Sequence, residues 1–120
     1  MSSTKIAFAM CGSFCTFSKA IPQAQLLKEK GYDIIPIMSQ NASATDTRFG
    51  LAKDFIEKLE KISEKKLINS IKDAEPLGPK NMCDAMVIAP CTGNTLAKLC
   101  NGITDTSVTM AAKSLLRVGK

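Results

Sequence analysis

The stretch Asp84-Ala-Met-Val-Ile-Ala-Pro-Cys-Thr-Gly-Asn-Thr95 joins a short apolar run to a loop of small polar residues. The run, Asp84–Ala89, predicts a strand of a parallel sheet. Two earlier runs predict further strands, Lys5–Met10 and Asp33–Met38, and the first has the form expected of a strand buried on both faces. Pro36 in the second of them favours an edge position, because proline has no N–H to donate to a neighbouring strand.

Helical patterns separate these strands. Their apolar residues recur every three or four positions, as in the stretch from Leu51 to Ile62. Gly31 ends the first helix, and Pro22 is expected near its start, where a missing N–H costs least. The expected helices are 18–30, 51–62, a further turn at 66–71, 94–99 and 108–117, with a polar loop at 39–47. This alternation predicts an α/β fold, a Rossmann-like or flavodoxin-like three-layer sandwich with a parallel sheet, in one domain over residues 1–120.

Length and composition narrow the class of protein. The chain has 120 residues, 45% of them hydrophobic, which suits one globular domain and excludes disorder, collagen and coiled coil. Five cysteines, an odd number, match no disulfide framework. The apolar stretch Ile6–Met10 is far shorter than the roughly 20 residues of a membrane span. We therefore expect a soluble cytoplasmic protein of a reducing compartment, with no membrane contact.

The net charge of +5 raises the question of nucleic acid. The most charged segment, Leu51 to Glu75, holds six lysines and six acidic residues and is neutral. The other basic residues are spread singly along the chain, and aromatic residues are few. A nucleic-acid site usually combines a basic stripe with aromatic side chains that stack on bases. The sequence therefore predicts no nucleic-acid partner.

Polar segments follow all three predicted strands: Met10–Ser18, Ser39–Asn41 and Pro90–Thr95. In open α/β sheets ligands bind in the crevice outside the carboxyl ends of the strands. Gly12 allows close approach of the backbone, and Ser13 adds a hydroxyl beside a helix start, an arrangement typical of phosphate binding. It is neither the dinucleotide fingerprint nor a P-loop. A capped turn with no ligand remains the alternative.

The segment Asp84–Asp105 resembles the flavoprotein family of FMN-binding, homo-oligomeric decarboxylases and related enzymes. Members have a strand ending in Ala-Pro, a loop of three small residues and Asn-Thr, and a helix that runs to Gly-Ile-x-Asp. The loop Cys11–Ser13 and the residue Ser39 fall where the family holds the FMN phosphate. The resemblance implies FMN as cofactor, held by Gly12, Ser13, Ser39, Thr92, Asn94 and Thr95. Asn94 has N-capping of a helix as its alternative role.

Four further segments are similar to family members that work in a two-subunit oxidoreductase: 47–50, 74–80, 86–94 and 105–113. This resemblance implies oxidation of a cyclic dihydro-dicarboxylate to its aromatic acid, in the mother cell of a sporulating bacterium. A partner subunit would bind NADP(H). The dicarboxylate substrate would need cations, for which Arg48, with its guanidinium fork, comes first and Lys80 second, beside Asn94. Solvated surface cations are the alternative for both.

Two features depart from the family pattern. The chain has no histidine, whereas the decarboxylases use a loop histidine, which counts against decarboxylation. Family chains also continue further, so we expect a C-terminally truncated member with an incomplete sheet. An FMN-dependent decarboxylase and a non-catalytic assembly subunit remain alternatives to the oxidoreductase.

No catalytic or metal-binding role is predicted for the five cysteines. Cys91 would be reactive if the following helix start lowered its pKa. Cys11 and Cys15 are expected to pack as small apolar residues. Cys83 and Cys100 have no further ligand at a spacing that suits zinc, so no metal site is predicted, and no catalytic residue is assigned.

Overall fold

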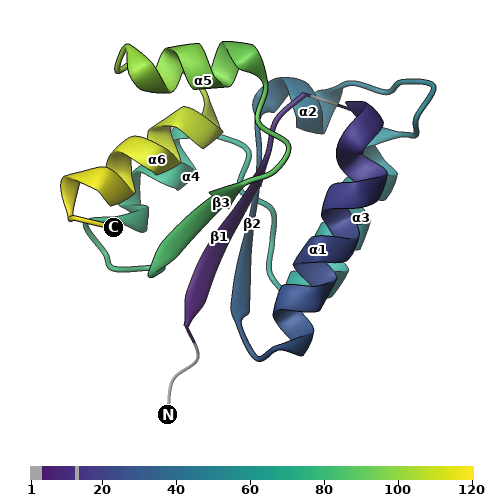
Figure 1. Ribbon diagram of the computed structural model, residues 1–120, viewed down its shortest axis with the longest axis horizontal. Coiled ribbons are helices and arrows are strands. Elements are labelled where there is room, and N and C mark those ends of the chain that lie inside the picture. The colour runs from purple at the N-terminus through teal and green to yellow at the C-terminus, as the bar shows by residue number, and fades with distance from the viewer. Residues whose placement is uncertain (1–3, 13) are drawn as a thin grey trace.

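Three parallel strands form the centre of the molecule (Figure 1). The computed structural model describes residues 4–12 and 14–120. The strands are β1 (Lys5–Met10), β2 (Asp33–Met38) and β3 (Ala85–Ile88), in the order β2-β1-β3. Phe8 lies opposite Pro36 of β2 on one side and Val87 of β3 on the other. The predicted bounds of the first two strands are confirmed, and so is the α/β fold.

One face of the sheet is covered by α1 (Phe17–Glu29) and α3 (Ala52–Ser63), which lie together in Figure 1. Phe8 and Met10 of β1 point into this core, where they are almost fully buried. The ring of Phe17 packs edge-on against that of Phe55, with 4.9 Å between their centroids. Pro22 lies inside α1 at its sixth position, so its expected place near the helix start is wrong.

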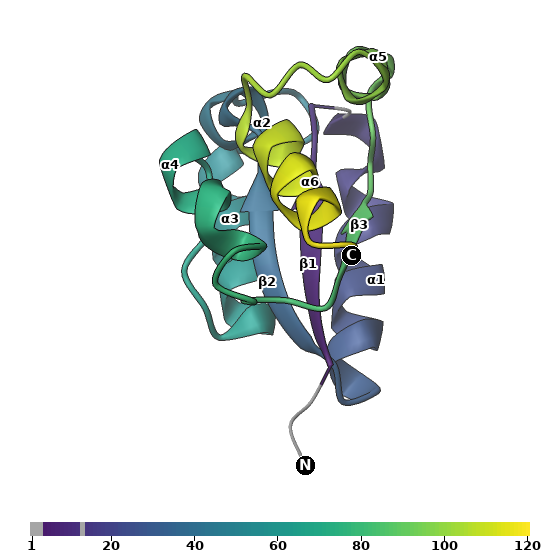
Figure 2. The same ribbon diagram turned by 90° about the vertical axis from the view of Figure 1, so that its left-hand side faces the viewer.

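The opposite face is covered by α4 (Ile71–Ala74), the 3-10 turn η2 (Glu75–Leu77) and α6 (Ser107–Arg117), which crosses in front of β1 in Figure 2. The β1 residues on this side are the small Ala7 and Ala9. Gly78 allows an even closer approach, because a Cβ there would lie 1.9 Å from the carbonyl oxygen of Ser114. Small residues therefore let α6 settle directly on the sheet.

The outer edge of β2 explains its proline. The N–H of Ile68 donates to the Pro36 carbonyl at 2.9 Å, and the Ile68 carbonyl accepts from Met38 N–H at 3.0 Å. The N and C=O of one strand residue face the same side, so the N–H that Pro36 lacks would point away from β1. The predicted edge position is confirmed. The helical turn expected at 66–71 is wrong, because Ile68 is extended and bridges to Ile37.

β3 is more exposed than β1. Val87 is 40% exposed, and Ala85 is exposed as well. Val87 faces the side covered by α1 and α3, and these helices pack over β1 and β2. The burial on both faces that was predicted for Lys5–Met10 is confirmed, whereas the similar apolar sequence of β3 has no helix over this face.

Three short elements gather where the strands end: η1 (Phe14–Thr16), α2 (Gln40–Ala44) and α5 (Gly93–Cys100), at the top of Figures 1 and 2. The α2 helix lies in the stretch that was expected to be loop. Ser39 explains it, since its side-chain oxygen accepts from Ala42 N–H at 3.1 Å and caps the helix. No helix in the described ranges 4–12 and 14–120 is long and apolar enough to cross a membrane.

Candidate functional site

A cavity of about 430 Å³ lies at the carboxyl ends of the strands. Its residues come from the ends of β1 and β2, from the starts of α2 and α5, and from the segment that enters α6. They are Cys11, Gly12, Ser39, Gln40, Asn41, Thr92, Asn94, Thr95, Lys98, Asp105 and Thr106. Seven of these eleven residues carry a hydroxyl or a side-chain amide.

Backbone hydrogen bonds hold the three strand ends together beneath this cavity. The N–H of Cys11 donates to the Pro90 carbonyl at 3.1 Å, and the N–H of Ser39 donates to the Met10 carbonyl at 3.0 Å. Gly12 follows at once, and a Cβ on it would lie 3.1 Å from Nδ2 of Asn41. Any side chain at position 12 would thus crowd the cavity wall.

The start of α5 forms a second wall. The Thr92 side chain accepts from Thr95 N–H at 3.1 Å and so caps the helix. The Thr92 hydroxyl donates to the Thr95 hydroxyl at 3.0 Å, which donates in turn to Sγ of Cys11 at 3.2 Å. Since Thr92 is the N-cap, the capping role considered for Asn94 is wrong. Asn94 is an exposed residue of the first turn that lines the cavity.

The start of α6 closes the cavity from the third side. Thr106 and Thr109 form a reciprocal capping box. Next to it, the Ser107 hydroxyl donates to the Met38 carbonyl at 2.5 Å, and Ser107 N–H donates to Oε1 of Gln40 at 3.0 Å. These bonds fix α6 to the end of β2 and to α2.

One ion pair lies in the wall. Nζ of Lys98 is 2.9 Å from Oδ1 of Asp105, and the Lys98 side chain is only 22% exposed. The pair is formally neutral, so the cavity depends on dipoles for its electrostatics. The N-termini of α5 and α6 both lie at its rim and place the positive ends of two helix dipoles there.

This donor set fits part of FMN. Hydroxyls, side-chain amides and helix N-termini suit a phosphate and a polyol chain. The volume also falls within the roughly 300–1,000 Å³ of small-molecule sites. The described wall has no aromatic side chain, so it fits the phosphate and polyol end better than the flat ring.

Comparison with known proteins shows the family of this chain. The family model described as "Flavoprotein" matches residues 1–120. The chain belongs to the flavoprotein family. It is 44% identical over 113 residues to the B subunit of dipicolinate synthase from Bacillus subtilis strain 168, covering 94% of this chain and 56% of that protein.

Two solved structures share the family's fold. The crystal structure of the dipicolinate synthase B subunit from Bacillus halodurans matches with a TM-score of 0.85 and 40% identity, over 99% of this chain and 61% of that one. The FMN-dependent cysteine decarboxylase SpaF matches with a TM-score of 0.72 and 22% identity, over 92% and 62%, and shows the fold alone. This flavoprotein chain thus spans less than two thirds of the length of these relatives.

The structure brings most of the predicted cofactor residues of this flavoprotein together. Five line the cavity: Gly12, Ser39, Thr92, Asn94 and Thr95. Ser13 lies outside the described residues. Their role towards FMN stays a prediction, but their convergence is a property of the fold.

The two predicted substrate cations lie elsewhere. Arg48 belongs to the turn before α3, with its guanidinium 5.0 Å from the centroid of the Phe49 ring. Lys80 lines a different cavity, of about 460 Å³, near the amino ends of β1 and β3, together with Lys5, Lys65 and Lys66. Neither cation lines the cavity that holds Asn94. The fold thus gathers two lysines of the charged segment, Lys65 and Lys66, with Lys5 and Lys80, which are single in the sequence.

Sequence reasoning missed several residues of the wall as site residues: Gln40, Asn41, Lys98, Asp105 and Thr106. Gln40 and Asn41 could have been found, because they directly follow the second strand in a segment that was already singled out. Lys98 and Asp105 could not, since their ion pair joins α5 to the next loop and depends on the tertiary fold.

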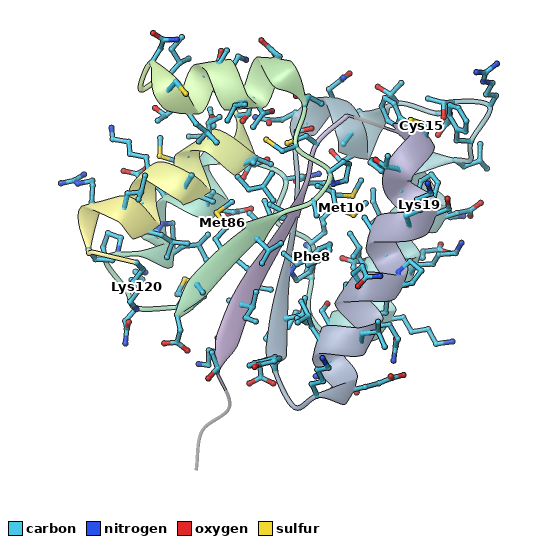
Figure 3. All side chains as sticks on the ribbon, viewed as in Figure 1. Phe8, Met10, Cys15, Lys19, Met86 and Lys120 are labelled. Atoms are coloured by element: carbon cyan, nitrogen blue, oxygen red, sulfur yellow. The ribbon has the colours of Figure 1, made fainter. Side chains whose placement is uncertain are left out.

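The thiols behave differently from expectation. The pKa of Cys91 is raised above its ordinary value by partial burial and by the neighbouring Cys11, so the condition set for a reactive Cys91, a lowered pKa, is not met. Cys11 is buried as expected, whereas Cys15, in the 3-10 turn η1 just before α1, is exposed (Figure 3). Among the residues that the structure describes, no group of three potential ligands is placed to hold a metal ion.

Proposed function

We propose that this chain is the flavin-binding part of a dipicolinate synthase B subunit, an oxidoreductase subunit that helps to convert a dihydrodipicolinate-type intermediate to dipicolinate. The observation that carries the proposal is the cavity at the strand ends, whose wall is built from hydroxyls, amides and two helix N-termini. The similarity to the B subunit of the Bacillus subtilis enzyme supports the choice of reaction.

Each side of the cavity has a separate task in this proposal. Gly12 and Ser39 lie at the ends of adjacent strands, where a phosphate can approach the backbone closely. Thr92 and Thr95 hold the start of α5 rigid through their mutual hydrogen bonds, which keeps Asn94 at the rim. Bound FMN would supply the ring that accepts a hydride as the substrate becomes aromatic.

The proposed partners follow from the same assignment. The nicotinamide-binding A subunit of dipicolinate synthase would carry NADP(H), and this chain would act in a homo-oligomer in the cytoplasm of the sporulating mother cell. The name of the similar Bacillus subtilis protein, a B subunit, supports the existence of a partner subunit.

The FMN claim is tested by placing a negative charge in the cavity. Asn94→Asp puts a carboxylate at the rim, where it repels phosphate, while the α5 dipole favours the new charge and preserves the fold. We expect FMN affinity to fall by about tenfold or more, equal to about 1.4 kcal/mol, in titrations of flavin fluorescence. Asn69→Asp is the matched control, because Asn69 is exposed, lies just before the start of α4 and is outside the cavity.

Equal FMN affinity in the two variants, or no uptake of FMN by the unaltered chain, would contradict the flavin proposal. The reaction is assayed in the presence of the A subunit. NADPH formation that needs both proteins supports the oxidoreductase. Release of carbon dioxide would assign a decarboxylase instead, and FMN-independent assembly with the A subunit would assign a structural role.

A further inference from the structure

A second cavity, of about 330 Å³, lies between α5 and α6. Its wall comes from the second half of α5, the connecting loop and one side of α6. The residues are Lys98, Leu99, Gly102, Ile103, Thr104, Thr109, Lys113, Leu116 and Arg117. Three of them are cations and none is acidic, while Leu99, Ile103 and Leu116 supply apolar surface.

The pattern of α6 explains how this wall arises. Val108, Ala111 and Leu115 recur at helical spacing and are buried against the sheet. A second set, Thr109, Lys113, Leu116 and Arg117, recurs at the same spacing on another side and lines the cavity. Leu116 is 69% exposed, a large apolar residue that the fold leaves uncovered.

The two cations of α6 are held near one another without an ion-pair partner. Lys113 and Arg117 are four residues apart, which places their Cβ atoms about 5–6 Å apart and makes their charges repel. Among the described residues, no carboxylate lies within 4.0 Å of either charged group. Glu75 lines a separate cavity of about 80 Å³ with both of them but forms no ion pair with either. An anion between the two cations would relieve their repulsion.

Lys98 connects this cavity to the first one, because it lines both. Its charge is matched by Asp105 at 2.9 Å. The cation excess that remains in the second cavity is therefore the pair on α6, Lys113 and Arg117. A ligand bound there would lie beside the proposed cofactor cavity.

We propose that the cavity between α5 and α6 binds a small planar dicarboxylate, the substrate or product class of the reaction, through Lys113 and Arg117. This inference rests on the proposed function for the role of the ligand. Two carboxylates match two unpaired cations, and the guanidinium of Arg117 can take a carboxylate in bidentate fashion. The apolar walls of Leu99, Ile103 and Leu116 cover the ring between the carboxylates.

The lysine cavity at the amino ends of β1 and β3 provides the matched comparison. It holds four lysines, Lys5, Lys65, Lys66 and Lys80, and a volume of about 460 Å³. It does not share a wall with the proposed cofactor cavity. Variants in it change the net charge of the chain by the same amount and leave the α5–α6 cavity untouched.

The test titrates pyridine-2,6-dicarboxylate into the chain and follows backbone amide shifts and binding heat. In the unaltered protein we expect shifts at Gly102–Thr104 and along α6. The double variant Lys113→Gln/Arg117→Gln should lose at least tenfold in affinity, whereas Lys65→Gln/Lys80→Gln should keep the original value. Pyridine-2-carboxylate, with one carboxylate fewer, should bind more weakly than the dicarboxylate.

Equal losses in the two double variants, or shifts centred on the lysine cavity, would overturn the proposal. FMN affinity is measured on the same samples and should not change in Lys113→Gln/Arg117→Gln. If the dicarboxylate binds as expected but FMN does not, the proposed function fails and this site stands. If FMN binds and the dicarboxylate does not, the site fails and the flavin assignment stands.

Discussion

β1 and β3 are neighbouring strands of one sheet, with similar apolar sequences and very different surroundings. In β1, Ala7 to Met10 are almost fully buried, with helices on both faces. In β3, exposed and half-buried residues alternate, and the side that faces away from α6 is open at Val87. The burial of a strand therefore depends on the helices above it as much as on the strand's own residues.

The largest expected effect is a loss of stability that differs between variants of β1 and β3. Phe8→Ala removes a ring that is 1% exposed and leaves a cavity between β1 and the α1–α3 layer. We expect it to lower the free energy of unfolding by about 3–5 kcal/mol. Val87→Ala, on the same face but 40% exposed, should cost well under half as much. Urea denaturation of both variants measures the difference, and equal losses would mean that Val87 is covered in solution.

A second variant tests whether close contact of α6 is what buries β1. Gly78→Ala places a methyl group 1.9 Å from the Ser114 carbonyl oxygen and so pushes η2 away from α6. Overpacking of this kind costs about 1–3 kcal/mol, measured by urea denaturation. Gly93→Ala is the control, because a Cβ there meets nothing within 4 Å. Equal stability of the two variants would show that η2 and α6 can separate freely.

The smallest expected effect is a pH dependence of the free energy of unfolding, and it comes from Cys83, just before β3. Burial raises the pKa of the Cys83 thiol above its ordinary value of 9.0, despite the opposing charge of Lys120, whose ammonium donates to the Cys83 carbonyl at 2.9 Å (Figure 3). Above pH 9 the unfolded thiol therefore loses its proton before the folded one. The free energy of unfolding should fall as pH rises through this range.

The contribution of Cys83 to the pH dependence of stability is measured by comparing two proteins. Lysines titrate in the same range, so the measurement compares the unaltered protein with Cys83→Ala in urea denaturation at pH 7 to 10.5. The variant should lose stability less steeply with rising pH. Identical slopes would show that the thiol is open to water, as Val87 is on the neighbouring part of β3.

The first and last residues of β1 and β2 could be predicted from the sequence. Each apolar run is followed by a polar or small residue, at which the extended backbone ends. The segment around Ile68 could not, since its apolar pair Leu67-Ile68 suits a helix as well as an extended edge. The choice between helix and extended chain depends on the edge of β2, where the Pro36 carbonyl and the Met38 N–H are available to Ile68. This contact exists only in the folded protein, so the local sequence does not predict it.

The candidate site also contains residues that could be predicted from the sequence and residues that could not. Gly12, Ser39 and the segment Thr92–Thr95 at the start of α5 could be predicted because they follow, within a few residues, strands whose ends must meet. Lys98 and Asp105 belong to a helix and a later loop, and their bond depends on how α5 turns back over the sheet. For Arg48 the sequence suggested a suitable group and not its position. Its guanidinium can bind a carboxylate, but the residue lies on a turn outside the cavity.

The bonds of Ser107 make the cavity depend on distant parts of the chain. Its hydroxyl and N–H connect α6 to the Met38 carbonyl and to Gln40, which lie 69 and 67 residues earlier in the chain. Loop closure has to precede these contacts, as it has to precede the bond between Lys5 N–H and the Asp84 side chain, 79 residues apart. A chain in which α6 has not docked lacks one side of the cavity. Any ligand of that cavity would therefore bind the chain with α6 docked and stabilise that state against unfolding.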